Sequence, residues 1–147
     1  SRARGARRAD RQLVRSVGEL LPDVKKIGAR VVIENMLGYE LVKDGNYERP
    51  LGRTVEEVLH IMSLVPREVD AAVDTNHIDN PELLISALGR RVRTIHVSDG
   101  DGRNECHELP GRGRGDNDWT AILKALYRMR TTGASSCTGR RRRSSRS

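Results

Sequence analysis

Three short runs of apolar residues, each followed by a stretch with helical periodicity, constrain the fold more than any other feature of this chain. The runs read ARVVIEN (residues 29–35), VDAAVD (69–74) and VRTIHVSD (92–99). The first is too apolar for a half-exposed strand and is typical of a buried parallel one. The connections between the runs are long enough for the crossovers that parallel strands require. The sequence therefore predicts an α/β fold with three parallel strands.

Apolar residues at helical spacing predict four helices that alternate with these strands. They cover residues 10–28, 55–65, 81–89 and 119–129. Thr54 and Glu57 form a capping-box pattern at the start of the second helix, and Pro81 suits the first position of the third. Pro22 predicts a kink or break within the first helix. The predicted loops are residues 37–53 and 100–118. Three strands are too few for a closed barrel.

The net charge of +7 is concentrated in two arginine-rich ends. Residues 1–9 carry four arginines and residues 131–147 carry five, with no Asp or Glu in either segment. Subtracting these nine charges from +7 leaves −2 for residues 10–130. Such low-complexity basic ends are typically disordered, so nucleic acid is not an expected partner. We expect disordered tails at residues 1–9 and 131–147 and one folded domain at residues 10–130.

The composition argues against several classes of protein. No run of 18 apolar residues is present, as a transmembrane helix would require. The arginine-rich start lacks the apolar segment of a secretory signal. Cys106 and Cys137 form no CxxC pair, which argues against a disulfide scaffold or a zinc knuckle and favours a reducing compartment. We therefore expect a cytoplasmic protein that does not cross a membrane.

Each predicted strand carries, at or near its end, an ionisable residue of the metal-ligand type: Glu34, Asp74 and His96. In parallel α/β folds, active sites assemble at the carboxyl ends of the strands. Neighbouring strands lie only about 4.8 Å apart, so the three side chains can converge on one ion. Two carboxylates and one imidazole suit Mn, Mg, Co or Zn better than a thiolate-preferring metal.

Each of these residues also has an alternative role that needs no metal. Glu34 could be a strand-end charge turned to solvent. Asp74, together with His77, could cap the following helix through local hydrogen bonds. His96 could be a histidine that is satisfied within the core. His107, in the long polar loop, could be exposed without any function.

Four motifs, taken in order, resemble the xylose isomerase-like TIM barrels, the sugar phosphate isomerase/epimerase superfamily. They read VVIENM, DTNHID, IHVSDGDG and HELPGRGRGDNDWTAILKAL. The resemblance covers about residues 10–129 and implies a partial (β/α) TIM barrel, roughly strands five to seven with their helices. It also implies a divalent metal (Mn, Mg, Co or Zn) held by Glu34, Asp74 and His96, with Glu34 as the general base.

The same resemblance assigns expectations to the loops. His77, in the D-x-x-H motif that begins at Asp74, and His107 would contact the substrate or hold an additional metal. Arg112 or Arg114, in the GRGRG segment, would meet a sugar phosphate. The implied substrate is a small sugar or sugar phosphate, and the implied reaction is proton transfer through an enediolate.

The chain departs from the family pattern at both ends. Nothing in it corresponds to the first half of the barrel. The segment RTTGASSCTGRRRRSSRS stands where relatives carry strand eight and a second catalytic Glu, and no Glu follows Glu108. We therefore expect a fragment of a metal-dependent isomerase or epimerase that is poorly active or inactive by itself. Its unpaired strand edges would favour self-association.

Other functions remain open at this point. One is the zinc-dependent apurinic-site endonuclease branch of the same superfamily, whose members carry a further Asp-x-His pair where this chain has Glu105-x-His107. Another is a non-catalytic basic binding module, which the −2 charge of residues 10–130 disfavours. A third is a truncated product without activity of its own.

Overall fold

The structure is a computed structural model, and it describes residues 2–37, 41–43, 46–48, 50–113 and 115–131. Helices and strands follow one another in the order α1 (Arg2–Lys26), β1 (Val32–Glu34), β2 (Leu41–Lys43), β3 (Asn46–Glu48), α2 (Val55–Leu64), β4 (Asp70–Asp74), α3 (Pro81–Leu88), a 3-10 turn (Gly89–Arg91), β5 (Val92–His96) and α4 (Trp119–Thr131).

Strands β1, β4 and β5 form one parallel sheet in which β4 lies in the centre. In the register of this sheet, Glu34 lies opposite Ala72, and Asp74 lies opposite His96. The three carboxyl ends therefore meet at one edge of the sheet. The predicted α/β fold with three parallel strands is confirmed, and it agrees with part of a TIM barrel.

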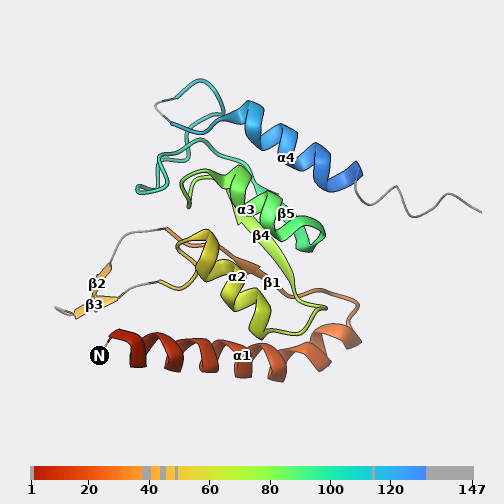
Figure 1. Ribbon diagram of the computed structural model, residues 1–147. Helices are drawn as coiled ribbons and strands as arrows, with labels where there is room; N and C mark the ends of the chain where they lie inside the picture. Colours follow the sequence, from red (N-terminus) through yellow and green to blue (C-terminus); the bar gives the residue numbers. More distant parts are fainter. Residues whose placement is uncertain (1, 38–40, 44–45, 49, 114, 132–147) are drawn as a thin grey trace, which may run out of the picture.

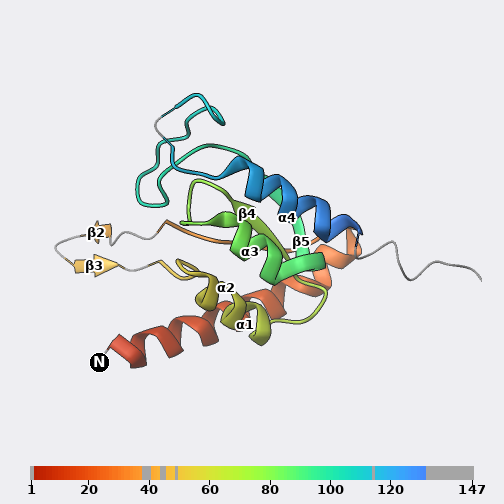
Figure 2. The ribbon, with the colours of Figure 1, turned by 45° about the horizontal axis from the view of Figure 1, so that its top comes forward.

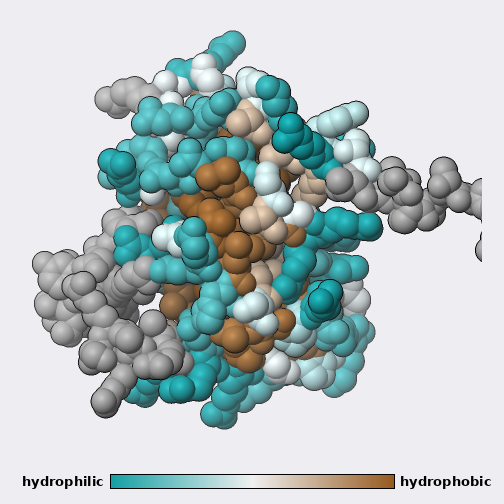
Figure 3. Space-filling view, in the orientation of Figure 1, coloured by the Kyte–Doolittle hydropathy of each residue, from teal (hydrophilic) through white to brown (hydrophobic). Residues whose placement is uncertain are grey.

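Figures 1 and 2 show the helices side by side in chain order, from α1 through α2 and α3 to α4. Helix α3 packs against β4 and against both neighbouring helices. The core between the helices and the sheet consists of Val17, Leu21, Val58, Met62, Val65, Val69, Ala71, Val73, Ile78, Leu84, Ile85, Leu88, Val92, Ile122 and Ala125. Figure 3 shows further apolar side chains gathered at the centre of the helical face.

The N-terminal segment differs from the prediction. Residues 2–9, expected to be a disordered tail, belong to helix α1. Ala and Arg are strong helix formers, and this propensity extends the amphipathic helix that begins further along the chain. The helix also continues through Pro22 without a break. Residues 132–147 lie outside the described part of the chain. None of the described helices has a stretch long and apolar enough to cross a membrane.

The connection between β1 and α2 also differs in part from the predicted loop, because β2 and β3 pair within it as a short antiparallel ladder. The predicted Thr54 cap of α2 is present, whereas Glu57 bonds the amide of the preceding residue instead of that of Thr54. Thr54 Oγ1 accepts from the Glu57 amide at 3.3 Å, and Glu57 Oε2 accepts from the Arg53 amide at 3.0 Å. Asn80 precedes α3 in the left-handed region (φ 54°) and makes no side-chain capping bond.

Candidate metal centre

Glu34, Asp74 and His96 come together at the carboxyl edge of the sheet. His96 Nδ1 lies 2.9 Å from Glu34 Oε1 and 3.6 Å from Asp74 Oδ2. Each of the three residues ends its own strand, so the register of the parallel sheet places them side by side. The predicted convergence of these side chains is present in the structure.

Asn35, which sequence analysis did not single out, fixes the relative position of the two acidic residues. Its side chain donates from Nδ2 to the Asp74 carbonyl at 3.0 Å and accepts at Oδ1 from the Asp74 amide at 2.8 Å. The Asn35 residue is fully buried, at 0% exposure. This two-bond clamp extends the pairing of β1 and β4 past Glu34. The only signal in the sequence was the position of Asn35 directly after a strand-end carboxylate.

Thr75 joins β4 to β5 beyond the last paired residues of these strands. Its hydroxyl donates to the Ser98 carbonyl at 2.7 Å and accepts from the Ser98 amide at 3.1 Å. Its own amide donates to the His96 carbonyl at 3.1 Å. The chain around His96 is therefore held on the strand that carries Asp74.

His77 enters the same cluster from the loop after β4, and its hydrogen bonds indicate its tautomer. Nδ1 lies 3.2 Å from the carbonyl oxygen of Asn35, an acceptor only, so Nδ1 carries the proton. The lone pair is then on Nε2, which is buried and has no hydrogen-bond partner among the described residues. Nε2 lies 3.8 Å from Asp74 Oδ2 and 3.8 Å from Glu105 Oε1.

These distances fit a bound cation. Ligand atoms bound at about 2.1 Å from a common ion lie about 3–4 Å from one another. Glu34, Asp74 and His77 offer ligand atoms that all lie within 4.8 Å of one another, and His96 faces two of them. A buried imidazole lone pair directed between carboxylates is unsatisfied in the free chain, whereas a divalent cation would satisfy it.

A second group of possible ligands adjoins the first and shares His77 with it. His77, Glu105 and His107 also offer ligand atoms within 4.8 Å of one another. Glu105 Oε1 lies 3.8 Å from His107 Nε2, and the two imidazole rings meet edge to face with centroids 6.3 Å apart. His107 has a positive φ of 47°. The long polar loop therefore brings His107 next to His77 and Glu105.

Asp99 organises this loop from a buried position at 2% exposure. Oδ2 accepts from the Trp119 indole at 2.9 Å and the Gly111 amide at 3.0 Å, and Oδ1 accepts from Gly100 at 3.1 Å and Asn117 at 3.3 Å. Burial alone would raise the pKa of Asp99, but these hydrogen bonds outweigh it and lower the pKa. Sequence analysis missed this carboxylate, although it lies in the quoted IHVSDGDG motif.

The GRGRG segment lies against acidic side chains. A Cβ added to Gly115 would lie 2.2 Å from Asp99 Oδ1, and one added to Gly113 would lie 2.5 Å from the Glu108 Cβ. These glycines permit close packing of the loop. Arg112 is exposed and forms no side-chain hydrogen bond or ion pair with the described residues, and Arg114 lies outside them.

The geometry bears on the alternatives that need no metal. The His96 side chain is 49% exposed, so His96 is not a core histidine. Glu34 faces His96 and is only 33% exposed, which argues against a charge simply turned to solvent. Asp74 does form a local bond, since Oδ1 accepts from the Asn76 amide at 2.8 Å. Its other oxygen, Oδ2, remains directed at the two histidines.

Comparison with known proteins identifies the family of this chain. The model of a family described as xylose isomerase-like TIM barrel matches residues 1–146. The chain belongs to this family. It is 26% identical over 110 residues to fructoselysine 3-epimerase of Escherichia coli O157:H7, an alignment that covers 70% of this chain and 36% of that protein. The same values hold for fructoselysine 3-epimerase of Shigella flexneri. The chain thus spans little more than a third of the length of these two epimerases.

Proposed function

We propose that this chain carries the metal-binding part of a divalent-metal-dependent sugar isomerase or epimerase, with Glu34, Asp74 and His96 as ligands. The observation that supports this most is the approach of His96 Nδ1 to both carboxylates, at 2.9 and 3.6 Å. The order of the strand-end residues further supports assigning β1, β4 and β5 to strands five to seven of the barrel. Hard oxygen ligands with imidazole suit Mn, Mg, Co or Zn.

Glu34 is the proposed general base. When bound, a divalent cation polarises the carbonyl of a ketose and so acidifies the neighbouring C–H group. The Glu34 carboxylate takes that proton, and the electron pair of the broken C–H bond becomes part of an enediolate. Return of a proton to the other face of the same carbon gives the epimer, and return to the neighbouring carbon gives the isomer.

His77 and His107 are the proposed substrate-positioning groups. His77 is held by the Asn35 carbonyl and is 8% exposed, so its ring has one fixed orientation. His107 has a half-exposed side chain at the mouth of the site. A sugar hydroxyl can donate to the Nε2 lone pair of His77 where no second cation occupies it. The proposed substrate class is a small sugar or sugar phosphate.

Metal binding is tested by calorimetric titration of the chain with Mn²⁺. Asp74→Asn should abolish binding, because it replaces a charged oxygen ligand and places an amide donor toward the cation. Asp116→Asn is the matched control, since Asp116 is an exposed loop residue that belongs to neither ligand group. Equal Mn²⁺ affinity in the two variants would contradict the proposed metal centre.

Proton abstraction is tested by incubating a ketose and its phosphate with the chain and Mn²⁺ in D₂O. Deuterium at the carbon beside the carbonyl reports removal of the proton even where no epimer accumulates, so the assay does not need a second acid/base group. Glu34→Gln should reduce the exchange rate about 10²–10⁴-fold, the range for loss of a positioned acid/base group. Exchange that persists unchanged in Glu34→Gln would assign the base to another residue.

A second candidate function is metal-dependent cleavage of a phosphodiester at an apurinic site. It is favoured by the second ligand group, in which His77, Glu105 and His107 adjoin the first group. Two neighbouring cations can stabilise both the attacking oxygen and the leaving oxygen when a phosphodiester is hydrolysed. The test is incision of an oligonucleotide with one abasic site in the presence of Zn²⁺. Incision by the unmodified chain that is lost in His107→Gln would favour this function over the isomerase.

A further inference from the structure

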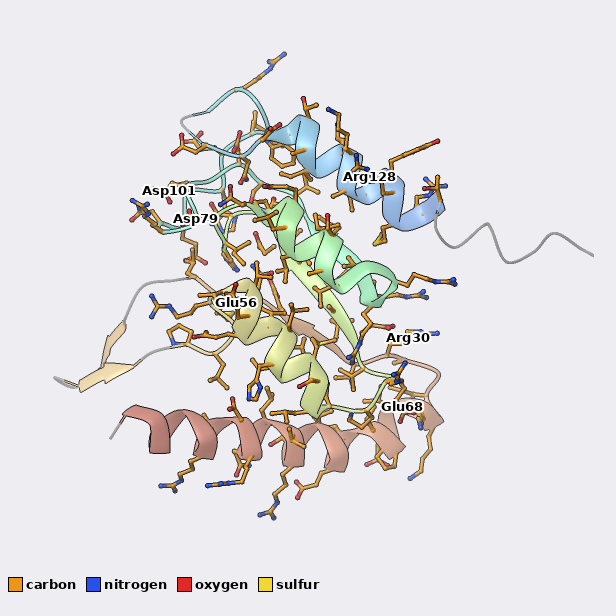
Figure 4. All side chains as sticks on the ribbon, in the orientation of Figure 1. Arg30, Glu56, Glu68, Asp79, Asp101 and Arg128 are labelled. Atoms are coloured by element: carbon orange, nitrogen blue, oxygen red, sulfur yellow. The ribbon has the colours of Figure 1, made fainter. Side chains whose placement is uncertain are left out.

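A cavity of about 590 Å³ opens on the loops next to the candidate metal centre. Its walls come from the start of α2, the loop between β4 and α3, and the loop that follows β5. Figure 4 shows Glu56, Asp79 and Asp101 on this side of the molecule, whereas Arg30 and Glu68 lie at the opposite end. Asp79 is two residues from His77, and Arg103 is two residues from Glu105, so the cavity and the metal centre share their loops.

Two guanidinium groups line this cavity without an ion-pair partner among the described residues. Arg53 is partly buried, and its Nε is fully buried with no hydrogen-bond acceptor. Its backbone is fixed, because the Arg53 amide donates to Glu57 Oε2 at 3.0 Å. Arg103 is exposed at the rim. A partly buried, unneutralised guanidinium is costly unless an anion approaches it.

The two carboxylates of the cavity do not neutralise these arginines. The backbone amide of Glu56 and the Thr54 hydroxyl lower the pKa of Glu56, so this carboxylate is engaged at the start of α2. Asp79 lies against Gly102, where an added Cβ would be 2.6 Å from Asp79 Oδ1. Gly102 has a φ of 67°, and this tight turn sets Arg103 at the rim. The starts of α2 and α3 add positive potential to the same cavity.

We propose that this cavity is a binding site for an oxyanion, the carboxylate or phosphate at the charged end of the sugar substrate, held by Arg53 and Arg103. Identification of the ligand as a substrate group rests on the proposed function, whereas the anion site itself does not. A substrate whose sugar reaches Glu34, Asp74 and His96 would extend its charged end over the shared loops. The site then selects anionic sugars over neutral ones.

The test is a titration of the metal-free chain, followed by NMR of the backbone amides, with inorganic phosphate in one arm and acetate in the other. Saturable shifts at Arg53, Thr54 and Arg103 are expected, and the tighter ligand identifies the anion as phosphate or carboxylate. Arg53→Gln should weaken binding about tenfold or more, the effect of losing one charge-assisted hydrogen bond. Asp79→Asn should strengthen binding, because it removes a negative charge from the wall.

Control variants distinguish binding in this cavity from nonspecific electrostatic attraction of anions to the basic chain and from binding at the metal centre. Arg67→Gln removes an exposed arginine that does not line the cavity, so it should leave anion binding unchanged, and Arg53→Lys should retain part of it. Absence of saturable binding, or equal losses in Arg53→Gln and Arg67→Gln, would overturn the proposal. Glu34→Gln should not affect phosphate binding. Anion binding without Mn²⁺ binding would therefore refute the proposed function alone, and the reverse result would refute the anion site alone.

Discussion

Substitution of Asp99 by Asn should destabilise the fold and loosen the loop that carries Glu105 and His107. Asp99 closes this loop in two ways. Its backbone exchanges two hydrogen bonds with Glu108, at 2.8 and 3.0 Å, and its carboxylate accepts four N–H groups at 2.9 to 3.3 Å. Asn has the same shape and leaves the backbone bonds intact, so the substitution isolates the contribution of the carboxylate.

The magnitude follows from counting acceptors. Each oxygen of Asp99 serves two donors, whereas Asn has one oxygen and one NH₂ group. Either orientation of the amide leaves two of the four donors facing another donor. A hydrogen bond to a charged group contributes about 1.5–3 kcal/mol. Since part of this loop is exposed and water can replace some of the loss, we expect unfolding to be easier by about 2–4 kcal/mol, a large share of the roughly 5–15 kcal/mol of a small domain.

The assay is urea unfolding at neutral pH, followed by far-UV circular dichroism and by the fluorescence of Trp119, the only tryptophan. Amide exchange at Gly111 and Asn117 should accelerate together with a shift of the Trp119 indole proton. Asp116→Asn, in the same loop, is the control. An unfolding free energy within about 0.5 kcal/mol of the unmodified chain, the range of neutral surface substitutions, with an unmoved indole resonance, would refute this account of Asp99.

Asn35→Ala should destabilise the fold by about 2–4 kcal/mol in urea unfolding, because it leaves the buried amide and carbonyl of Asp74 unpaired. Hydrogen bonds from Asn104 and Arg103 lower the pKa of Asp101 to about 2. The ionised Asp101 therefore stabilises the fold above about pH 4, and this stabilisation is lost as the pH falls toward 2. Acid-induced unfolding of Asp101→Asn should lack this pH-dependent loss of stability. Sedimentation should show concentration-dependent association, since β1 and β5 each pair on one side only within the described sheet.

Much of the fold could be predicted because its signals are local and repeated. The three apolar runs and the four helical patterns are each recognisable within a short stretch of sequence. The positions of β4, α2 and α3 therefore agree with the prediction to within one residue. The disagreement at the N-terminus arises because low hydrophobicity and high charge predict disorder there. A run of Ala and Arg has low hydrophobicity, yet it forms the first turns of α1 because helix propensity and continuity with an amphipathic segment favour it.

The part of the candidate site that strand pairing brings together could be predicted from the sequence. Glu34, Asp74 and His96 are strand-end residues, and parallel pairing alone brings such residues together. Asn35 and Asp99 were missed because an Asn or Asp in a loop has many local roles, and nothing in the sequence distinguishes a buried carboxylate with four donors from a surface turn. Arg53 was missed for a similar reason, since its buried Nε follows from tertiary packing rather than from the capping box beside it.

The strand-end residues and the second ligand group are held in place by different parts of the structure. The strand-end cluster of Glu34, Asp74 and His96 depends on sheet register, reinforced by the Asn35 clamp and the Thr75 bridge, so these three side chains move only if the sheet itself opens. The second group depends on Glu105 and His107, which the loop positions through Asp99. Asp99→Asn should therefore leave Mn²⁺ binding at Glu34, Asp74 and His96 nearly unchanged while it disperses the second group. Equal loss at both would mean that the loop and the sheet edge form one cooperative unit.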